Sequence, residues 1–109
     1  MSASPDTKAI NAALVGAKDL LAFDLKLTPE GYTLRLTLGR KGVPAATLLC
    51  TDVQNLEVNS SGEGFEQMYD LLVTDMREDG LDRIHYSLEE LERETIFLHC
   101  AGIQLILTS

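Results

Sequence analysis

From Phe23 to Leu38, apolar residues recur at every second position, and this alternation constrains the fold more than any other feature of the chain. It breaks only at Pro29-Glu30-Gly31, where residue types typical of turns follow one another. Two alternating runs joined by such a turn are typical of a β-hairpin with one buried and one solvated face. We therefore expect the chain to build an antiparallel sheet.

The first twenty residues show a different period. Ser4, Pro5 and Asp6 form a helix start, because a hydroxyl can cap the helix, proline suits the first helical position and an acid suits the positive end of the dipole. Apolar side chains then follow at helical spacing: Ile10, Ala13, Leu14, Ala17 and Leu21. We expect a helix over about residues 5–20, weakened at Gly16, whose apolar stripe must pack on another element.

Short strands are expected in the rest of the chain, because apolar and polar residues alternate there between turn residues. Their approximate ranges are 46–50, 84–88, 95–100 and 103–107, and residues 53–58 either continue the strand at 46–50 or start another. The last two are apolar on both faces, so we expect them to lie centrally in the sheet or under the helix.

Residues 64–78 fit two structures. Apolar residues at helical spacing are Phe65, Met68, Tyr69, Leu72, Val73 and Met76. Ser60 and Glu63 could form a capping box before such a helix, and Gly80 could end it. Tyr69, Leu71 and Val73 also alternate as in a strand. The helical period fits more positions and is favoured, with the strand as the alternative.

These elements predict an α+β fold in one domain over residues 1–109, with a flexible N-terminus at 1–4. An N-terminal helix would pack on a curved, mostly antiparallel β-sheet of about six strands, with a second helix at 64–78 left open. A chain of 109 residues can bury roughly two-thirds of its unfolded surface, enough for one core. Cys50 and Cys100 are expected to be buried thiols, because the chain has no disulfide-dense pattern. A bridge between them stays open if their strands are neighbours.

All of the net charge lies within residues 63–94. This segment contains eleven acids and three arginines, which account for the formal net charge of −8. Such a charge argues against binding to nucleic acid, whose phosphates require Lys and Arg, and against anionic membranes. The N-terminus does not resemble a secretory signal, and the most apolar run, 96–107, is too short to span a bilayer. We expect a cytoplasmic protein whose possible partner is a basic protein.

No residue pattern predicts catalysis. The segment from Asp75 fails as a calcium loop, because Arg77 and Tyr86 occupy positions that need oxygen ligands. The cysteines lie in no nucleophile motif, the histidines lack the spacing of metal ligands, and the glycines form no phosphate-binding loop. The many acids form no pair with contrasting environments of the kind a hydrolase needs. We expect a non-enzymatic protein with no catalytic residue, metal or cofactor.

The acidic segment has two interpretations. It can be a solvated face that keeps the protein soluble, or a docking face that attracts a basic protein through its field. Tyr and Leu side chains among the acids favour docking, because aromatic residues anchor interfaces. The candidate partner-binding residues are Glu66, Tyr69, Asp70, Glu78, Asp79, Asp82, Tyr86, Glu89, Glu90 and Glu92.

Over about residues 23–107, the sequence resembles small bacterial immunity-like proteins of the polymorphic-toxin type. The segments that carry the resemblance are Cys50–Leu56, Tyr69–Gly80, Ile84–Leu88, Glu92 and Ile96–Ile103. The resemblance implies a mostly antiparallel β domain that binds a protein, with a strand over Tyr69–Met76 and no catalytic residues. The leading hypothesis is an acidic protein-binding module, such as an immunity-like inhibitor of a basic toxin. The alternatives are a structural or homodimeric protein, which would use its apolar C-terminal strands or helix face, and a small ligand-binding protein or enzyme.

Overall fold

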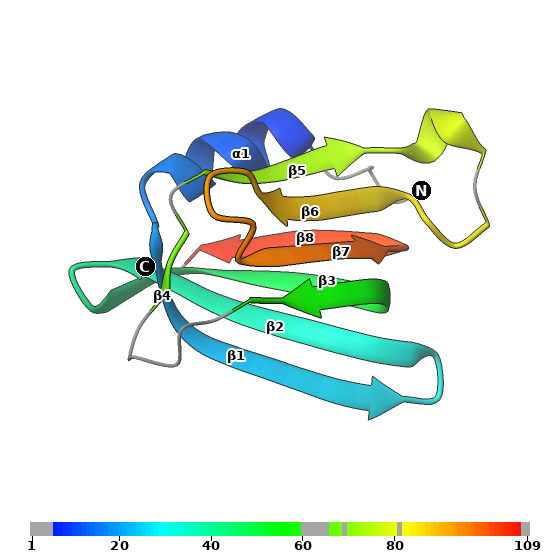
Figure 1. Ribbon diagram of the computed structural model, residues 1–109, viewed down its shortest axis with the longest axis horizontal. Helices are drawn as coiled ribbons and strands as arrows, with labels where there is room; N and C mark the ends of the chain where they lie inside the picture. Colours follow the sequence, from blue (N-terminus) through cyan, green and yellow to red (C-terminus); the bar gives the residue numbers. More distant parts are fainter. Residues whose placement is uncertain (1–5, 60–65, 69, 81, 108–109) are drawn as a thin grey trace.

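The computed structural model describes residues 6–59, 66–68, 70–80 and 82–107 (Figure 1). In this part of the chain, one helix, α1 (Thr7–Val15), precedes eight strands and one 3-10 turn, η1 (Arg77–Asp79). The strands are β1 (Asp19–Thr28), β2 (Gly31–Arg40), β3 (Val43–Val58), β4 (Glu66–Gln67), β5 (Leu71–Asp75), β6 (Tyr86–Glu90), β7 (Ile96–Cys100) and β8 (Gly102–Leu107). They form one open sheet in the order β4-β1-β2-β3-β7-β6-β5, with β8 paired to β3. All pairs are antiparallel, which confirms the α+β prediction.

The long strand β3 folds the sheet into two layers. Its first part pairs with β2 and β8, and its last residues pair with β7. Asp52 and Asn55 have φ values of 53° and 55°, and the ladders change register at both positions. Such bulges bend a strand, and Figure 1 shows β3 turning back on itself there. One layer therefore contains β4, β1, β2, β8 and the start of β3, and the other contains the end of β3, β7, β6 and β5.

The core lies between the two layers. Leu34, Leu36 and Leu48 point inward from one layer, and Leu88 and Leu98 point inward from the other, each with no exposed surface. Both cysteines lie in this core as free, buried thiols, as the sequence predicts.

The helix is shorter at both ends than its sequence pattern suggests. Its N-cap is Asp6, whose carboxylate accepts hydrogen bonds from the N–H groups of Lys8 (3.0 Å) and Ala9 (3.2 Å). Ser4, the expected cap, lies outside the described residues. The helix ends at Val15 rather than near residue 20, because the chain from Asp19 onward pairs with β2.

One side chain fastens α1 to the edge of the second layer. The Asn11 amide donates to the carbonyl of Val73 (2.9 Å) and its oxygen accepts from the N–H of Val73 (2.8 Å). Ile10 and Leu14, on the same helix, are buried. The helix therefore covers the outer edge of β5, which would otherwise present unpaired backbone groups.

Of the two structures that fit residues 64–78, the strand holds over Leu71–Asp75. Pairing with β6 places Leu71 and Val73 in the core, and this long-range burial outweighs the helical spacing of the local sequence. Helical geometry in the described part of the segment is confined to η1.

Candidate protein-binding surface

Two of the ten candidate surface residues are buried, so they do not belong to an exposed surface. Tyr86 is 3% exposed and Glu90 is 1% exposed. Both point inward because β6 alternates, which places them on the same face as the buried Leu88. The guanidinium of Arg77 lies 5.7 Å from the centroid of the Tyr86 ring and covers it from the outside.

Glu90 instead connects two segments of the chain through hydrogen bonds to their backbones. Its carboxylate accepts hydrogen bonds from the backbone N–H groups of Asp70 (2.9 Å), Glu92 (3.1 Å) and Arg93 (2.5 Å). Burial alone would raise the pKa of Glu90, but these backbone donors outweigh it, and the pKa lies below its usual range. Glu90 thus anchors the turn after β6 to the residue that precedes β5.

The remaining exposed candidates do not form one patch. Asp70 and Glu92 lie at one end of the β5–β6 hairpin, while Glu78, Asp79 and Asp82 lie at the other (Figure 1). Five residues of β5 separate the two ends, which corresponds to roughly 16 Å at the usual rise of a strand. These acids therefore form two separate groups, one at each end of the hairpin.

Two further candidates add little to the site. Glu66 lies in β4, where its backbone is paired with Leu20, and its side chain lies outside the described part. Tyr69 lies outside the described residues. Neither contributes to a described surface.

The acid at β5's end is already paired. Asp75 forms an ion pair with Arg77 (2.5 Å), and the hydrogen bond from Arg77 lowers the pKa of Asp75 to about 2. Arg83 likewise pairs with Asp52 at the fold of β3, and that hydrogen bond lowers the pKa of Asp52. Arg77 and Arg83, both in the acidic segment, are thus bound to carboxylates.

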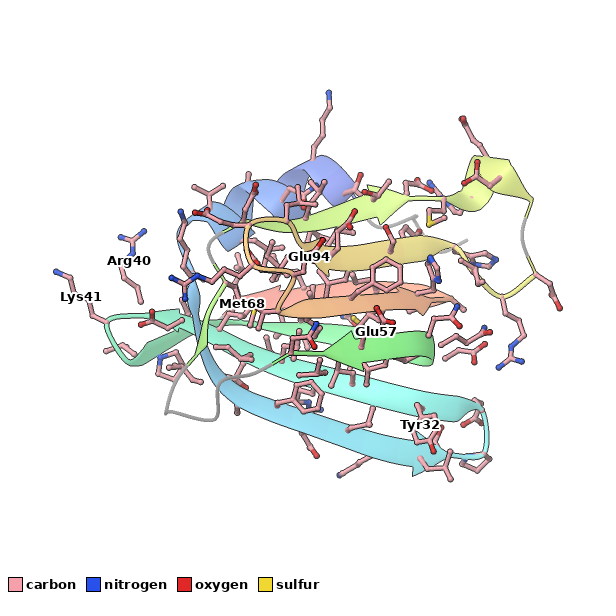
Figure 2. The ribbon with its side chains drawn as sticks, in the orientation of Figure 1. Tyr32, Arg40, Lys41, Glu57, Met68 and Glu94 are labelled. Carbon is pink, nitrogen blue, oxygen red and sulfur yellow. The ribbon has the colours of Figure 1, made fainter. Side chains whose placement is uncertain are left out.

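The register of the second layer brings together residues that are far apart in the sequence. Phe97 on β7 lies directly opposite Glu57 on β3 and opposite Glu89 on β6, and Glu89 lies opposite Leu72 on β5. Opposed residues project from the same face of a sheet. Glu57, Phe97, Glu89 and Leu72 therefore form a row across the outer face of the layer, which we call the Phe97 strip. Figure 2 shows Glu57 on β3 at one end of this face.

Phe97 is half-buried, and its ring meets the ring of His99 edge to face, with centroids 4.9 Å apart. The Asn55 side-chain amide donates to Nδ1 of His99 (2.9 Å) and orients that ring. The four strands β3, β5, β6 and β7 contain no Lys or Arg. The strip is thus an aromatic ring flanked by two carboxylates, with no basic residue on the strands that carry it.

Only Glu89 of the strip was a candidate from the sequence. Phe97 lies in an apolar run that suggests burial on both faces, and Glu57 lies outside the acidic segment. The sequence signal that could have identified Phe97 is the alternation along the last strands, which places Phe97 and His99 on one face.

A separate groove of about 350 Å³ opens between the first hairpin and the fold of β3. It is lined by Leu25, Tyr32, Val53, Gln54, Asn55 and Leu56. Nε2 of Gln54 is buried without a hydrogen-bond partner. Among the described residues, the lining includes no carboxylate, imidazole or thiol. A second depression, of about 480 Å³, is lined by the Asp75–Arg77 ion pair and Glu78.

In the part of the chain that the structure describes, no three His, Cys, Asp or Glu side chains converge on a point where they could hold a metal ion. Nor is α1, the helix of this part, long and apolar enough to cross a membrane. In comparisons with known proteins, no family model, no curated protein and no solved structure matches the chain.

Proposed function

We propose that this protein is a non-enzymatic protein-binding module that docks a basic partner on the Phe97 strip. The observation that carries the proposal is the position of Phe97 between Glu57 and Glu89, on strands that lack Lys and Arg. Aromatic side chains supply much of the binding energy of protein interfaces. Carboxylates beside such an anchor select a positively charged partner and speed its approach.

An immunity-like inhibitor that covers a basic surface of a toxin, such as a nuclease, is the role that best suits this chemistry and the sequence resemblance. The overall charge of −8 supports it, because long-range attraction steers a basic partner toward the protein. The low content of titratable groups in the groove argues for binding rather than catalysis.

Affinity purification from the native host, followed by titration of the purified partner, tests the proposal. Replacing both strip glutamates (Glu57→Gln with Glu89→Gln) should raise the dissociation constant about tenfold at low salt. Phe97→Ala should raise it about 30-fold, as expected for an aromatic anchor. The matched control is Glu78→Gln with Asp79→Gln, which removes the same charge from η1 and should change the affinity little.

The outcomes separate the possibilities. A basic protein that is retained by the wild type and the control, but lost by the strip variants, supports the proposal. An equal loss in the strip and η1 variants would mean that diffuse charge, not the strip, attracts the partner. Binding that does not weaken at about 0.5 M salt contradicts an electrostatic interface.

A further inference from the structure

Over most of its length, the outer edge of β1 has no pairing partner in the part of the chain that the structure describes. Among the described residues, β4 pairs with β1 only at Asp19 and Leu20. From Ala22 to Thr28, β1 has a described neighbour, β2, on one side only. Figure 1 shows this part of β1 along the border of the sheet. An open strand edge is a template for pairing with another chain.

The register shows which backbone groups this edge presents. The hairpin closes at the pair Thr28 and Gly31 with a two-residue turn, so that pair is hydrogen-bonded. Hydrogen-bonded and non-hydrogen-bonded pairs alternate along an antiparallel ladder. The N–H and C=O groups of Phe23, Leu25 and Leu27 therefore point away from β2, toward the open edge.

The side chains of the same segment separate into two faces. Phe23, Leu25 and Leu27 are 41%, 39% and 72% exposed although they share a face with the buried core of β2. Asp24 and Lys26 project from the opposite face and are exposed. Neither has an ion-pair partner within 4 Å among the described residues.

We propose that β1 pairs antiparallel with β1 of a second copy of this chain, about a two-fold axis at Leu25. In that register, Asp24 of each copy lies opposite Lys26 of the other, and Phe23 lies opposite Leu27. The charged pairs occupy the non-hydrogen-bonded positions, where opposed side chains are closest. An isologous contact of this kind closes as a dimer and occupies the β1 edge of both copies.

The charges select this register over its neighbours. An axis at Asp24 would place the two aspartates together, and an axis at Lys26 would place the two lysines together. A parallel arrangement would also oppose like charges, and a shift by one residue would put polar and apolar side chains on the same face. A lone charge on an edge strand normally discourages association. Here the opposite charges two residues apart complement each other in a second copy.

Sedimentation equilibrium of the full chain over the micromolar range tests the proposal. The wild type should be a dimer. Lys26→Asp should raise the dissociation constant about tenfold or more, because two attractive pairs become repulsive. Asp24→Lys should do the same, with added repulsion from Arg35, which lies opposite Asp24 on β2. The matched control is Lys41→Asp, which makes the same charge change in the β2–β3 turn (Figure 2) and should leave the dimer intact.

Mixing the two single variants in equal amounts should restore association, since each charge then meets its opposite in the other chain. The double variant, Asp24→Lys with Lys26→Asp, should dimerise again for the same reason. Circular dichroism and thermal unfolding confirm that each variant is folded. A wild type that stays monomeric, a dimer unaffected by Lys26→Asp, or a mixture that fails to associate would overturn the proposal.

Discussion

Replacing Glu90 with alanine should destabilise the protein by about 3 kcal/mol. The carboxylate is 1% exposed and accepts three backbone N–H groups, at 2.5 to 3.1 Å. Each donor left without a partner costs about 1–3 kcal/mol when buried, but Glu92 and Arg93 are exposed and their N–H groups can recover water. Asp70 is exposed as well, so we expect the loss to come mainly from the broken connection between the turn after β6 and the residue that precedes β5.

Urea unfolding followed by circular dichroism measures the change. Glu90→Gln keeps the shape and one acceptor oxygen and should cost about half as much, while Glu92→Ala, on the surface of the same turn, should stay within about 0.5 kcal/mol of the wild type. Because the pKa of Glu90 is lowered by folding, its ionic contribution is fully present above an unfolded pKa of about 4.3 and is lost as the pH falls through the folded value. The difference between the wild type and Glu90→Gln should therefore shrink in acid. A Glu90→Ala protein as stable as the Glu92→Ala control would refute this account.

Three further outcomes follow from single positions. Asn11→Ala should lower the free energy of unfolding by about 1–3 kcal/mol and speed amide hydrogen exchange in β5, since it removes the partner of both backbone groups of Val73. Unchanged exchange would contradict the role of Asn11 in holding α1 to β5. Gly39→Ala should lower the free energy of unfolding by about 3 kcal/mol or prevent folding, because a Cβ would lie 2.2 Å from the carbonyl oxygen of Val43. A melting temperature equal to that of the wild type would disprove this close approach. Cys50 should react with a thiol reagent far more slowly in the folded protein than in urea. The pKa of Cys50 is raised by the hydrogen bond with Cys100 and by burial. The contribution of the neutral thiol to the free energy of unfolding should therefore be fully present below about pH 8.5 and should fall as the pH rises further. A free energy of unfolding that stays constant up to about pH 10 would contradict this.

The first hairpin could be predicted because its information is local. Alternation and the turn residues lie within one continuous stretch, and the structure pairs Leu25 with Leu34 as that pattern requires. The fold of β3 could not be read in the same way, because it depends on which strands pair with each half. Two residues at this fold nevertheless give a signal in the sequence. Asp52 and Asn55 belong to the residue types that, apart from glycine, most readily adopt positive φ. They interrupt a run that otherwise reads as a continuous strand.

The candidate site was harder to predict because its charged residues are distant in the sequence and come together only across the sheet. Glu57 and Glu89 are 32 positions apart in the sequence, yet both flank Phe97 in the register of the strands. The burial of Glu90 could have been predicted from the sequence, because the alternation that buries Leu88 also points Glu90 inward. The strand over Leu71–Asp75 could not be predicted from the local sequence, because only its pairing with β6 decides against the helix.

The two proposed surfaces have a joint consequence that can be measured. A two-fold axis at Leu25, perpendicular to the first layer, keeps the second layers of both copies on the same side of the extended sheet. The two Phe97 strips would then face in one direction, and an immobilised basic partner could engage both at once. Such bivalent binding slows dissociation well beyond that of one site without adding a contact. Lys26→Asp should therefore shorten the residence time on a dense partner surface at least about tenfold while leaving the affinity for soluble partner unchanged. Equal residence times for the two proteins on that surface would show that the strips do not act together.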